Sequence, residues 1–220
     1  MKQDVIRQLS QAGAPAVPVL IEALKDRSWL VRLEAIRALG QIGDASAVPA
    51  LCNVLERDVE YVGLAAAIVL GQLGDTSAVP TLCKALGSRG VELRRAAAKA
   101  LGQIRDTSAT QRLIEALRDR EAEVRIAACE ALGRIGDETA IPALEKAMED
   151  SYRDPRRDAP YPVRMAACEA LSQMGKSAVP ALIRSLGDAS VEVRLKAWYA
   201  LNRIGDPQAV HALHIHCVSL

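Results

Sequence analysis

The chain contains no phenylalanine, and aromatic residues make up only 3% of its 220 residues. Its longest purely apolar run, residues 64–70, is far shorter than the roughly 18 residues of a membrane-spanning helix. The first residues, Met1 to Asp4, lead into no apolar stretch, so we expect no signal peptide. Half of the residues are nevertheless apolar, which suffices for a core of Ala, Leu, Ile and Val. We therefore expect a cytoplasmic protein without membrane insertion.

The chain also has no excess of either charge. Its 28 basic and 27 acidic residues leave a formal charge of +1. A surface dedicated to nucleic acid normally brings a strong basic excess, so we expect no nucleic-acid partner. The five cysteines are scattered singly, without a CxxC pair. They are predicted to be reduced thiols that fill the core, as in cytosolic proteins.

Histidine is absent from the body of the chain, which argues against catalysis. The three histidines, His211, His214 and His216, all lie near the end, so a central Ser–His–Asp or Cys–His arrangement is excluded. No glycine-rich phosphate loop occurs. His211, His214 and Cys217 have the spacing of one helix face, but no second cluster completes a tetrahedral metal site. We predict no catalytic residue and no metal site.

What the chain does have is an internal repeat. Asp44, Asp75, Asp106 and Asp137 recur at a constant spacing of 31 residues. They open the segments DASAVPALCNVL, DTSAVPTLCKAL, DTSATQRLIEAL and DETAIPALEKAM, and each is followed by a second segment such as VRLEAIRALGQIG. Six full repeats result, at about 13–43, 44–74, 75–105, 106–136, 137–175 and 176–205, with half-repeats at 1–12 and 206–220.

Each half of a repeat has the pattern of a helix. Val17, Leu20, Ile21 and Leu24 follow the 3.6-residue period. The recurrent aspartates stand where a carboxylate caps a helix, prolines fall in the first turn, and glycines such as Gly43 follow the second segment. One such hairpin cannot bury its apolar face alone, whereas stacked hairpins share a continuous core. The prediction is an all-α protein, an α-solenoid of about six hairpins forming a single domain over residues 1–220.

The pattern D-x-x-A-V-P-x-L-x-x-x-L…V-R-x-x-A-x-x-A-L-G-x-I-G resembles the short HEAT-like repeat of phycobilin lyase subunits and of many prokaryotic proteins. The resemblance extends over nearly the whole chain. It implies a right-handed solenoid whose second helices line a concave face. Because the motif residues are structural, the resemblance says much less about function.

An acidic residue precedes an arginine by six positions in several repeats. The pairs are Asp26 with Arg32, Asp119 with Arg125, Asp158 with Arg164 and Asp188 with Arg194. HEAT families use such residues as a ladder between repeats, so we expect a packing role. The second repeat has Arg57 and Gly63 in these places, and the third keeps Arg94 but has Ser88. We expect the ladder to be rewired there.

The concave face is predicted to carry an apolar patch at the second repeat. When the repeats are aligned, Ile68 stands at a position, or column, that is filled in the other repeats by Arg37, Lys99, Glu130, Glu169 and Tyr199. Exposed apolar patches often mark partner surfaces, and Tyr and Trp are common anchors. The candidate binding residues on this face are Trp29, Leu30, Leu33, Tyr61, Leu64, Ile68 and Tyr199. The alternative is that the curvature of the stack half-buries them.

An insertion of eight residues distinguishes the fifth repeat. Residues 150–162 read DSYRDPRRDAPYP, and three prolines forbid a continuous helix. The candidate binding residues there are Tyr152, Arg153, Arg156, Arg157 and Tyr161, because clustered arginines can clamp phosphate or carboxylate groups. The alternative is a solvated loop whose charge Asp154 and Asp158 partly cancel.

Three functions fit these patterns. The first is a non-catalytic scaffold that binds another protein on its concave face and needs no cofactor. The second, which the resemblance implies, is a phycobilin lyase subunit or a lyase-like chaperone that binds a bilin and acts on a phycobiliprotein. The third is an engineered binding scaffold, although the imperfect repeats and the insertion argue against a pure consensus design.

Overall fold

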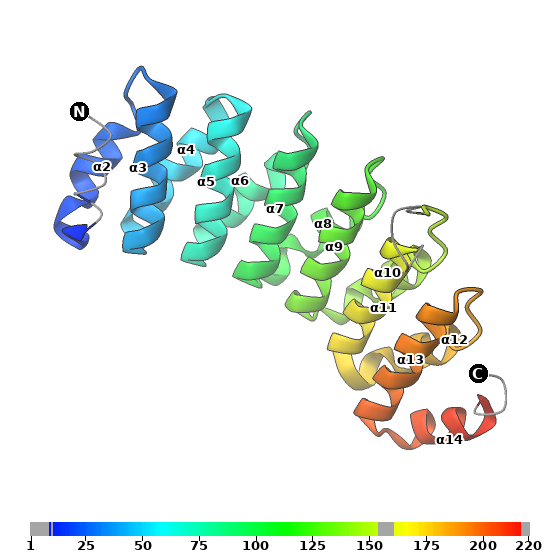
Figure 1. Cartoon of the computed structure of the whole chain (residues 1–220). Helices are drawn as coiled ribbons and strands as arrows, with labels where there is room; N and C mark the ends of the chain where they lie inside the picture. Colours follow the sequence, from blue (N-terminus) through cyan, green and yellow to red (C-terminus); the bar gives the residue numbers. More distant parts are fainter. Residues whose placement is uncertain (1–8, 10, 154–160, 217–220) are drawn as a thin grey trace. The chain divides into compact units, whose positions relative to one another are not determined.

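The computed structural model of the 220-residue chain describes Leu9 and residues 11–153 and 161–216. Within these residues the regular structure is entirely helical (Figure 1). The chain divides into two compact units, residues 1–109 and residues 110–220. Each unit is a row of helical hairpins, which confirms the all-α repeat fold, while the single domain stays a prediction.

The first unit contains three hairpins. Their helices are α2 (Val17–Ala23) with α3 (Trp29–Ile42), α4 (Val48–Arg57) with α5 (Glu60–Leu73), and α6 (Val79–Ala85) with α7 (Val91–Ile104). The second helices α3, α5 and α7 lie side by side in one layer, and α4 and α6 lie behind them (Figure 1). One face of each unit is therefore built from second helices alone.

The second unit repeats this pattern. It contains α8 (Thr110–Ala116) with α9 (Ala122–Ile135), α10 (Ile141–Ala147) with α11 (Pro162–Met174), and α12 (Val179–Ser185) with α13 (Val191–Ile204). A lone helix, α14 (Pro207–His216), packs on α12 and α13, as the sequence predicted for the last half-repeat. The lone helix predicted for residues 4–12 falls almost entirely outside the described residues.

The turns between hairpins have the predicted caps. The carboxylates of Asp44, Asp75 and Asp106 each accept a hydrogen bond of 2.8 Å from the backbone N–H two residues later. Hydrogen bonds from the serine hydroxyl groups and from these backbone N–H groups hold the pKa of all three carboxyl groups below its ordinary value. The caps begin short 3₁₀ turns, such as Ala45–Ala47, that lead directly into the α-helices. The repeat therefore starts the same way each time for a local reason.

Small residues set the distance between neighbouring second helices. Ala66 and Ala97 in the first unit, and Ala128 and Ala167 in the second, are completely buried. Gly71 of α5 lies so close to α7 that an added Cβ would stand 2.7 Å from the Cα of Ala100. Any larger residue at position 71 would push the two helices apart. The buried alanines and Gly71 thus let neighbouring second helices approach closely.

The ladder exists, but its partners differ from those expected. The guanidinium of Arg32 donates to the carbonyl of Asp26 at 2.7 Å, within its own hairpin. It also donates two hydrogen bonds, of 2.5 and 2.6 Å, to the carboxylate of Asp58 in the next hairpin. The prediction that the second repeat lacks its acid was wrong, because α4 is three residues longer than α2 and Asp58 follows its end.

A second correction concerns the fifth repeat. Arg125 donates to the carboxylate of Asp150 at 2.7 and 3.1 Å, so Asp150 is the ladder acid of that repeat. Arg164 donates to the carbonyl of Asp150 at 2.7 Å and to the carboxylate of Asp188 at 3.2 Å. The expected partner Asp158 lies outside the described residues. The insertion lies between the ladder acid and the arginine of this repeat. It therefore lengthens their separation in sequence but leaves Asp150 in the ladder.

Candidate functional site

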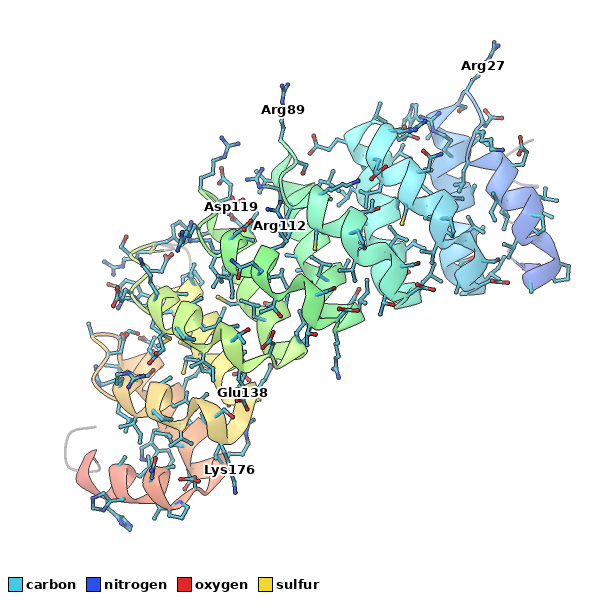
Figure 2. The ribbon with its side chains drawn as sticks, turned by 180° about the vertical axis from the view of Figure 1, so that it is seen from behind. Arg27, Arg89, Arg112, Asp119, Glu138 and Lys176 are labelled. Atoms are coloured by element: carbon cyan, nitrogen blue, oxygen red, sulfur yellow. The ribbon has the colours of Figure 1, made fainter. Side chains whose placement is uncertain are left out.

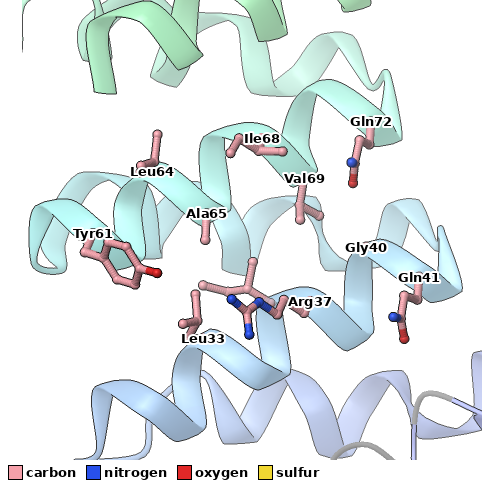
Figure 3. Close-up of a pocket in the computed structure, with 11 residues that line it drawn as sticks. Leu33, Arg37, Gly40, Gln41, Tyr61, Leu64, Ala65, Ile68, Val69 and Gln72 are labelled. Atoms are coloured by element: carbon pink, nitrogen blue, oxygen red, sulfur yellow. The ribbon is translucent and has the colours of Figure 1, made fainter. Parts of the chain in front are cut away.

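A groove runs between α3 and α5 in the first unit (Figure 3). Its cavity volume is about 610 Å³. Apolar residues of both helices line it, namely Leu33, Ile36, Tyr61, Leu64, Ala65, Ile68 and Val69. Arg37, Gln41 and Gln72 are the polar side chains of its rim. The structure therefore brings four of the predicted binding residues, Leu33, Tyr61, Leu64 and Ile68, to one place.

The predicted residues differ in how they meet solvent. Tyr61 is 56% exposed and Ile68 is 47% exposed, as expected for a surface patch. Leu64 is half-buried. Leu33 is only 5% exposed, so the prediction that it lies on the open side of α3 was wrong. It is one of the residues that line the floor of the groove.

Two further predicted residues stand beside the groove. Trp29 and Leu30, at the start of α3, are both exposed. The ring of Trp29 meets the ring of Tyr61 edge to face, with 5.8 Å between centroids. Such aromatic contacts prefer this geometry, and this one ties the first turn of α3 to the first turn of α5. The exposed apolar surface thus continues from the groove to the ends of both helices.

Sequence reasoning missed Gly40, which shapes the groove. A Cβ at this position would stand 2.9 Å from Cγ2 of Val69, so only glycine allows α5 to lie this close to α3. The side chain of Gln72 lies against the same backbone. The recurrent Gly–Gln pair in the A-L-G-Q segments was the available signal, because a glycine inside a helix needs a packing reason.

The groove is suited to binding rather than to chemistry. Arg37 is the one charged residue among those that line it, and its guanidinium donates to Glu34 at 2.8 Å. The lining contains no histidine, cysteine or carboxylate that could act as a base or a nucleophile. An apolar floor with a few polar groups on the rim is typical of a site that takes an apolar side chain or ligand.

The remaining predicted residues lie in the second unit. Tyr199 of α13 is 66% exposed and stands beside a cavity of about 300 Å³. Lys196 and Glu169, which form an ion pair of 2.6 Å, line the same cavity. Tyr199 thus belongs to a polar site and not to an apolar patch.

Of the two described ends of the insertion, only the first is exposed. Tyr152 and Arg153 are exposed, whereas Tyr161 is half-buried beneath the guanidinium of Arg164, 4.4 Å from its ring centroid. Arg156 and Arg157 lie outside the described residues, so the predicted arginine cluster stays a prediction. Tyr161 already has an intramolecular cation–π partner.

The cysteines within the described residues are free thiols. Burial raises the pKa of Cys129 and of Cys168 to about 12, and it also raises the pKa of Cys52. His211 and His214 are exposed on α14. Among the described residues no group of three or more metal-ligating side chains comes together, and Cys217 lies outside them.

The chain matches a known family of repeat proteins over nearly its whole length. The HEAT-repeat family profile matches residues 1–68, 17–95, 49–123, 84–160 and 156–217. The chain therefore belongs to the HEAT-repeat family, as its repeat pattern indicated. No curated protein sequence matches it. In the part of the chain that the structure describes, no helix is both long and apolar enough to cross a membrane.

Solved structures give more particular likenesses. The complex of CpcE and CpcF of phycocyanin lyase from Nostoc sp. PCC7120 is similar, with 27% identity and a TM-score of 0.62 over 90% of this chain and 80% of that one. An engineered protein is 24% identical, with a TM-score of 0.63 over 86% and 96% of the two chains. A designed armadillo repeat protein is 19% identical, with a TM-score of 0.60 over 86% and 99%. The last two likenesses show the fold alone.

Proposed function

We propose that this chain is a non-catalytic scaffold that holds a partner protein in the α3–α5 groove. The proposal depends on one observation, which is that Tyr61 and Ile68 are exposed above an apolar floor. The position of Ile68 is filled by Arg37 and Lys99 in the neighbouring hairpins of this unit, so an apolar side chain at this position occurs only at the groove. Tyr and Trp next to an apolar cleft are typical anchors of protein interfaces.

Removal of an apolar partner residue from water supplies the driving force. Burial of apolar surface is worth about 25 cal/mol per Å², so one large side chain inserted between Tyr61 and Ile68 contributes about 2 kcal/mol. The polar rim of Arg37, Gln41 and Gln72 then offers hydrogen bonds that fix the orientation of the partner. Neither contribution needs a reacting group.

Photo-crosslinking tests this proposal. A photoreactive residue placed at position 68 is expected to give a defined adduct with one protein in a lysate of the source organism. The same residue at position 19 is the control, because Val19 of α2 is at least as exposed as Ile68 but lies outside the groove. Equal labelling at the two positions, or none at position 68, would contradict the proposal.

A second candidate function is lyase-like binding of a bilin. It is favoured by the 27% identity to the phycocyanin lyase complex over most of this chain. That lyase is itself a complex of two proteins, which also fits a protein partner. The apolar floor would take the tetrapyrrole, and Arg37 would face a propionate.

Absorbance spectroscopy separates the two candidates. A defined spectral shift on mixing with a bilin, lost in Ile68→Lys and kept in Val19→Lys, supports the lyase-like function. An unchanged spectrum together with a specific adduct at position 68 supports the scaffold. A shift that survives Ile68→Lys would place the bilin outside this groove.

A further inference from the structure

One rung of the arginine ladder is missing in the first unit. In an intact rung, an arginine of the second helix donates to its own turn and to the acid of the next hairpin, as Arg32 does with Asp58. In the second hairpin Gly63 stands at the arginine position, and Ser88 replaces the acid of the third hairpin. Both charged members of the rung are therefore absent together.

A cavity lies beside the missing rung. It has a volume of about 510 Å³ and lies between the ends of α4 and α6. Leu55, which lines it, is the residue that a Cβ on Gly63 would meet, with Cδ1 at 3.8 Å. Ser88, at the other end of the rung, lines it as well. The cavity therefore adjoins both ends of the missing rung, through Leu55 and Ser88.

The lining of this cavity favours an anion. Arg57 ends α4, is exposed, and forms no salt bridge with a described residue. Lys84 lines the cavity too and pairs with Glu56 at 2.9 Å on the surface. Thr81 and Ser88 also line the cavity, and their hydroxyl groups now bond to Cys52 and to the carbonyl of Gly90, so a ligand would have to take over these hydrogen bonds.

The carboxylates of this region do not cancel that charge. Glu56 lines the cavity beside the two cations and offsets one of them, so the lining keeps one net positive charge. Asp58 is held by Arg32, and the carboxylate of Glu60 lies against Gly90. Because the Lys84–Glu56 pair is exposed to solvent, it is weak, and Lys84 can turn to another anion at little cost.

We infer that this cavity, which lies beside the missing ladder rung, binds a phosphate monoester. A phosphate group accepts hydrogen bonds at three oxygens, which suits a guanidinium, an ammonium and two hydroxyl groups. Leu55, Ala85 and Leu93 form an apolar floor for the organic part of the ligand. This site lies outside the α3–α5 groove and shares none of the residues that line it, so it is independent of the proposed scaffold function.

The test uses two probes, inorganic phosphate and phenyl phosphate, titrated into isotope-labelled protein at constant ionic strength. We expect saturable amide shifts in residues 55–57 and 81–93, with phenyl phosphate binding at least fivefold more tightly because its ring reaches the floor. Arg57→Gln is expected to weaken binding at least tenfold. The matched control is Arg27→Gln, because Arg27 projects from the corresponding turn of the first hairpin, where the rung is intact (Figure 2).

Filling the cavity is the complementary test. The double substitution Gly63→Arg with Ser88→Asp restores the rung and is expected to abolish phosphate binding in a folded protein. The inference is overturned if neither probe gives saturable shifts, if Arg27→Gln and Arg57→Gln weaken binding equally, or if the refilled, folded variant still binds. Should the double variant not fold, the comparison of Arg57→Gln with Arg27→Gln still decides.

Discussion

Arg32 and Asp58 form a two-pronged ion pair that joins the first hairpin to the second, with hydrogen bonds of 2.5 and 2.6 Å. Both side chains are mostly buried, and the hydrogen bond to Asp58 is the main cause of the raised pKa of Arg32. The same guanidinium holds the carbonyl of Asp26. One side chain thus fixes its own turn and the position of the next.

Removal of one partner leaves the other partly buried without its counter-charge. We expect Asp58→Ala to lower the free energy of unfolding by about 2–3 kcal/mol, because an unpaired buried charge is costly. A double-mutant cycle with Arg32→Ala, followed by urea unfolding, should give a coupling energy above 1 kcal/mol. The control cycle is the exposed pair Glu22–Lys25, for which we expect less than about 0.5 kcal/mol. Equal coupling in the two cycles would show that the ladder does not hold the hairpins together.

Local features were the part of the fold that the sequence predicted well. The cap of Asp44 and the left-handed Gly43 depend on neighbours a few residues away, so their spacing alone revealed them. Asp58 was missed because the ladder acid follows the end of α4, and the sequence did not show that α4 is longer than the first helix of the first repeat. Leu33 was misplaced because a single helix does not show which neighbour covers it.

The groove itself needed two helices to become visible. Ile68 was identified because it breaks the pattern of its column, and Tyr61 because it is an aromatic residue beside it; the structure exposes both. The depth of the groove depends on how closely Gly40 lets Val69 approach, which is a contact between hairpins. Likewise Ser172 replaces the glycine of its column, and Arg203 of the next hairpin donates to its hydroxyl group. Such paired changes have no local signature.

The end of α7 offers a prediction about backbone strain. Arg105 has a φ of 60° and is the one described non-glycine residue with a positive φ, at a position where Gly74 ends the preceding second helix with a φ of 71°. We expect Arg105→Gly to raise the free energy of unfolding by about 0.5–1 kcal/mol, since relief of the left-handed strain exceeds the added entropy of the unfolded chain.

Gly74→Arg is the matched reverse change. A Cβ at position 74 would meet nothing within 4 Å, so the substitution adds backbone strain and no clash. It should lower the free energy of unfolding by a similar amount, measured by urea unfolding of both variants. If Arg105→Gly is destabilising, the arginine side chain contributes more than its backbone costs.

The capping aspartates predict how stability depends on pH. Asp44, Asp75 and Asp106 have pKa values below 3.8 in the folded state, because their carboxylates accept backbone and serine hydrogen bonds. A depressed pKa gives stability that is present above the unfolded pKa and is lost as pH falls through the folded pKa. We therefore expect stability to decline progressively below about pH 4.

Replacing one capping aspartate with asparagine distinguishes the effect of its negative charge from the effect of its capping hydrogen bond. Asp75→Asn keeps an acceptor for the backbone N–H of Ser77 but cannot titrate. Its loss of stability between pH 4.5 and pH 2.5 should be smaller than that of the unchanged protein, as measured by thermal unfolding across that range. An identical decline in both proteins would show that acid unfolding starts elsewhere.

The buried thiols give the last prediction. A pKa of about 12 for Cys129 and Cys168 means that roughly one thiol in ten thousand is ionised at pH 8, and the thiolate is the reacting species. Cys129 and Cys168 are buried, whereas Cys52 and Cys83 are partly exposed on α4 and α6. We expect iodoacetamide at pH 8 to alkylate Cys52 and Cys83 within a time that leaves the two buried cysteines unmodified. Peptide mass spectrometry measures each site, and unfolding in urea should equalise them because it removes the burial that raises the pKa. Rapid native alkylation of Cys129 would mean that α9 opens far more readily than its packing against α11 implies.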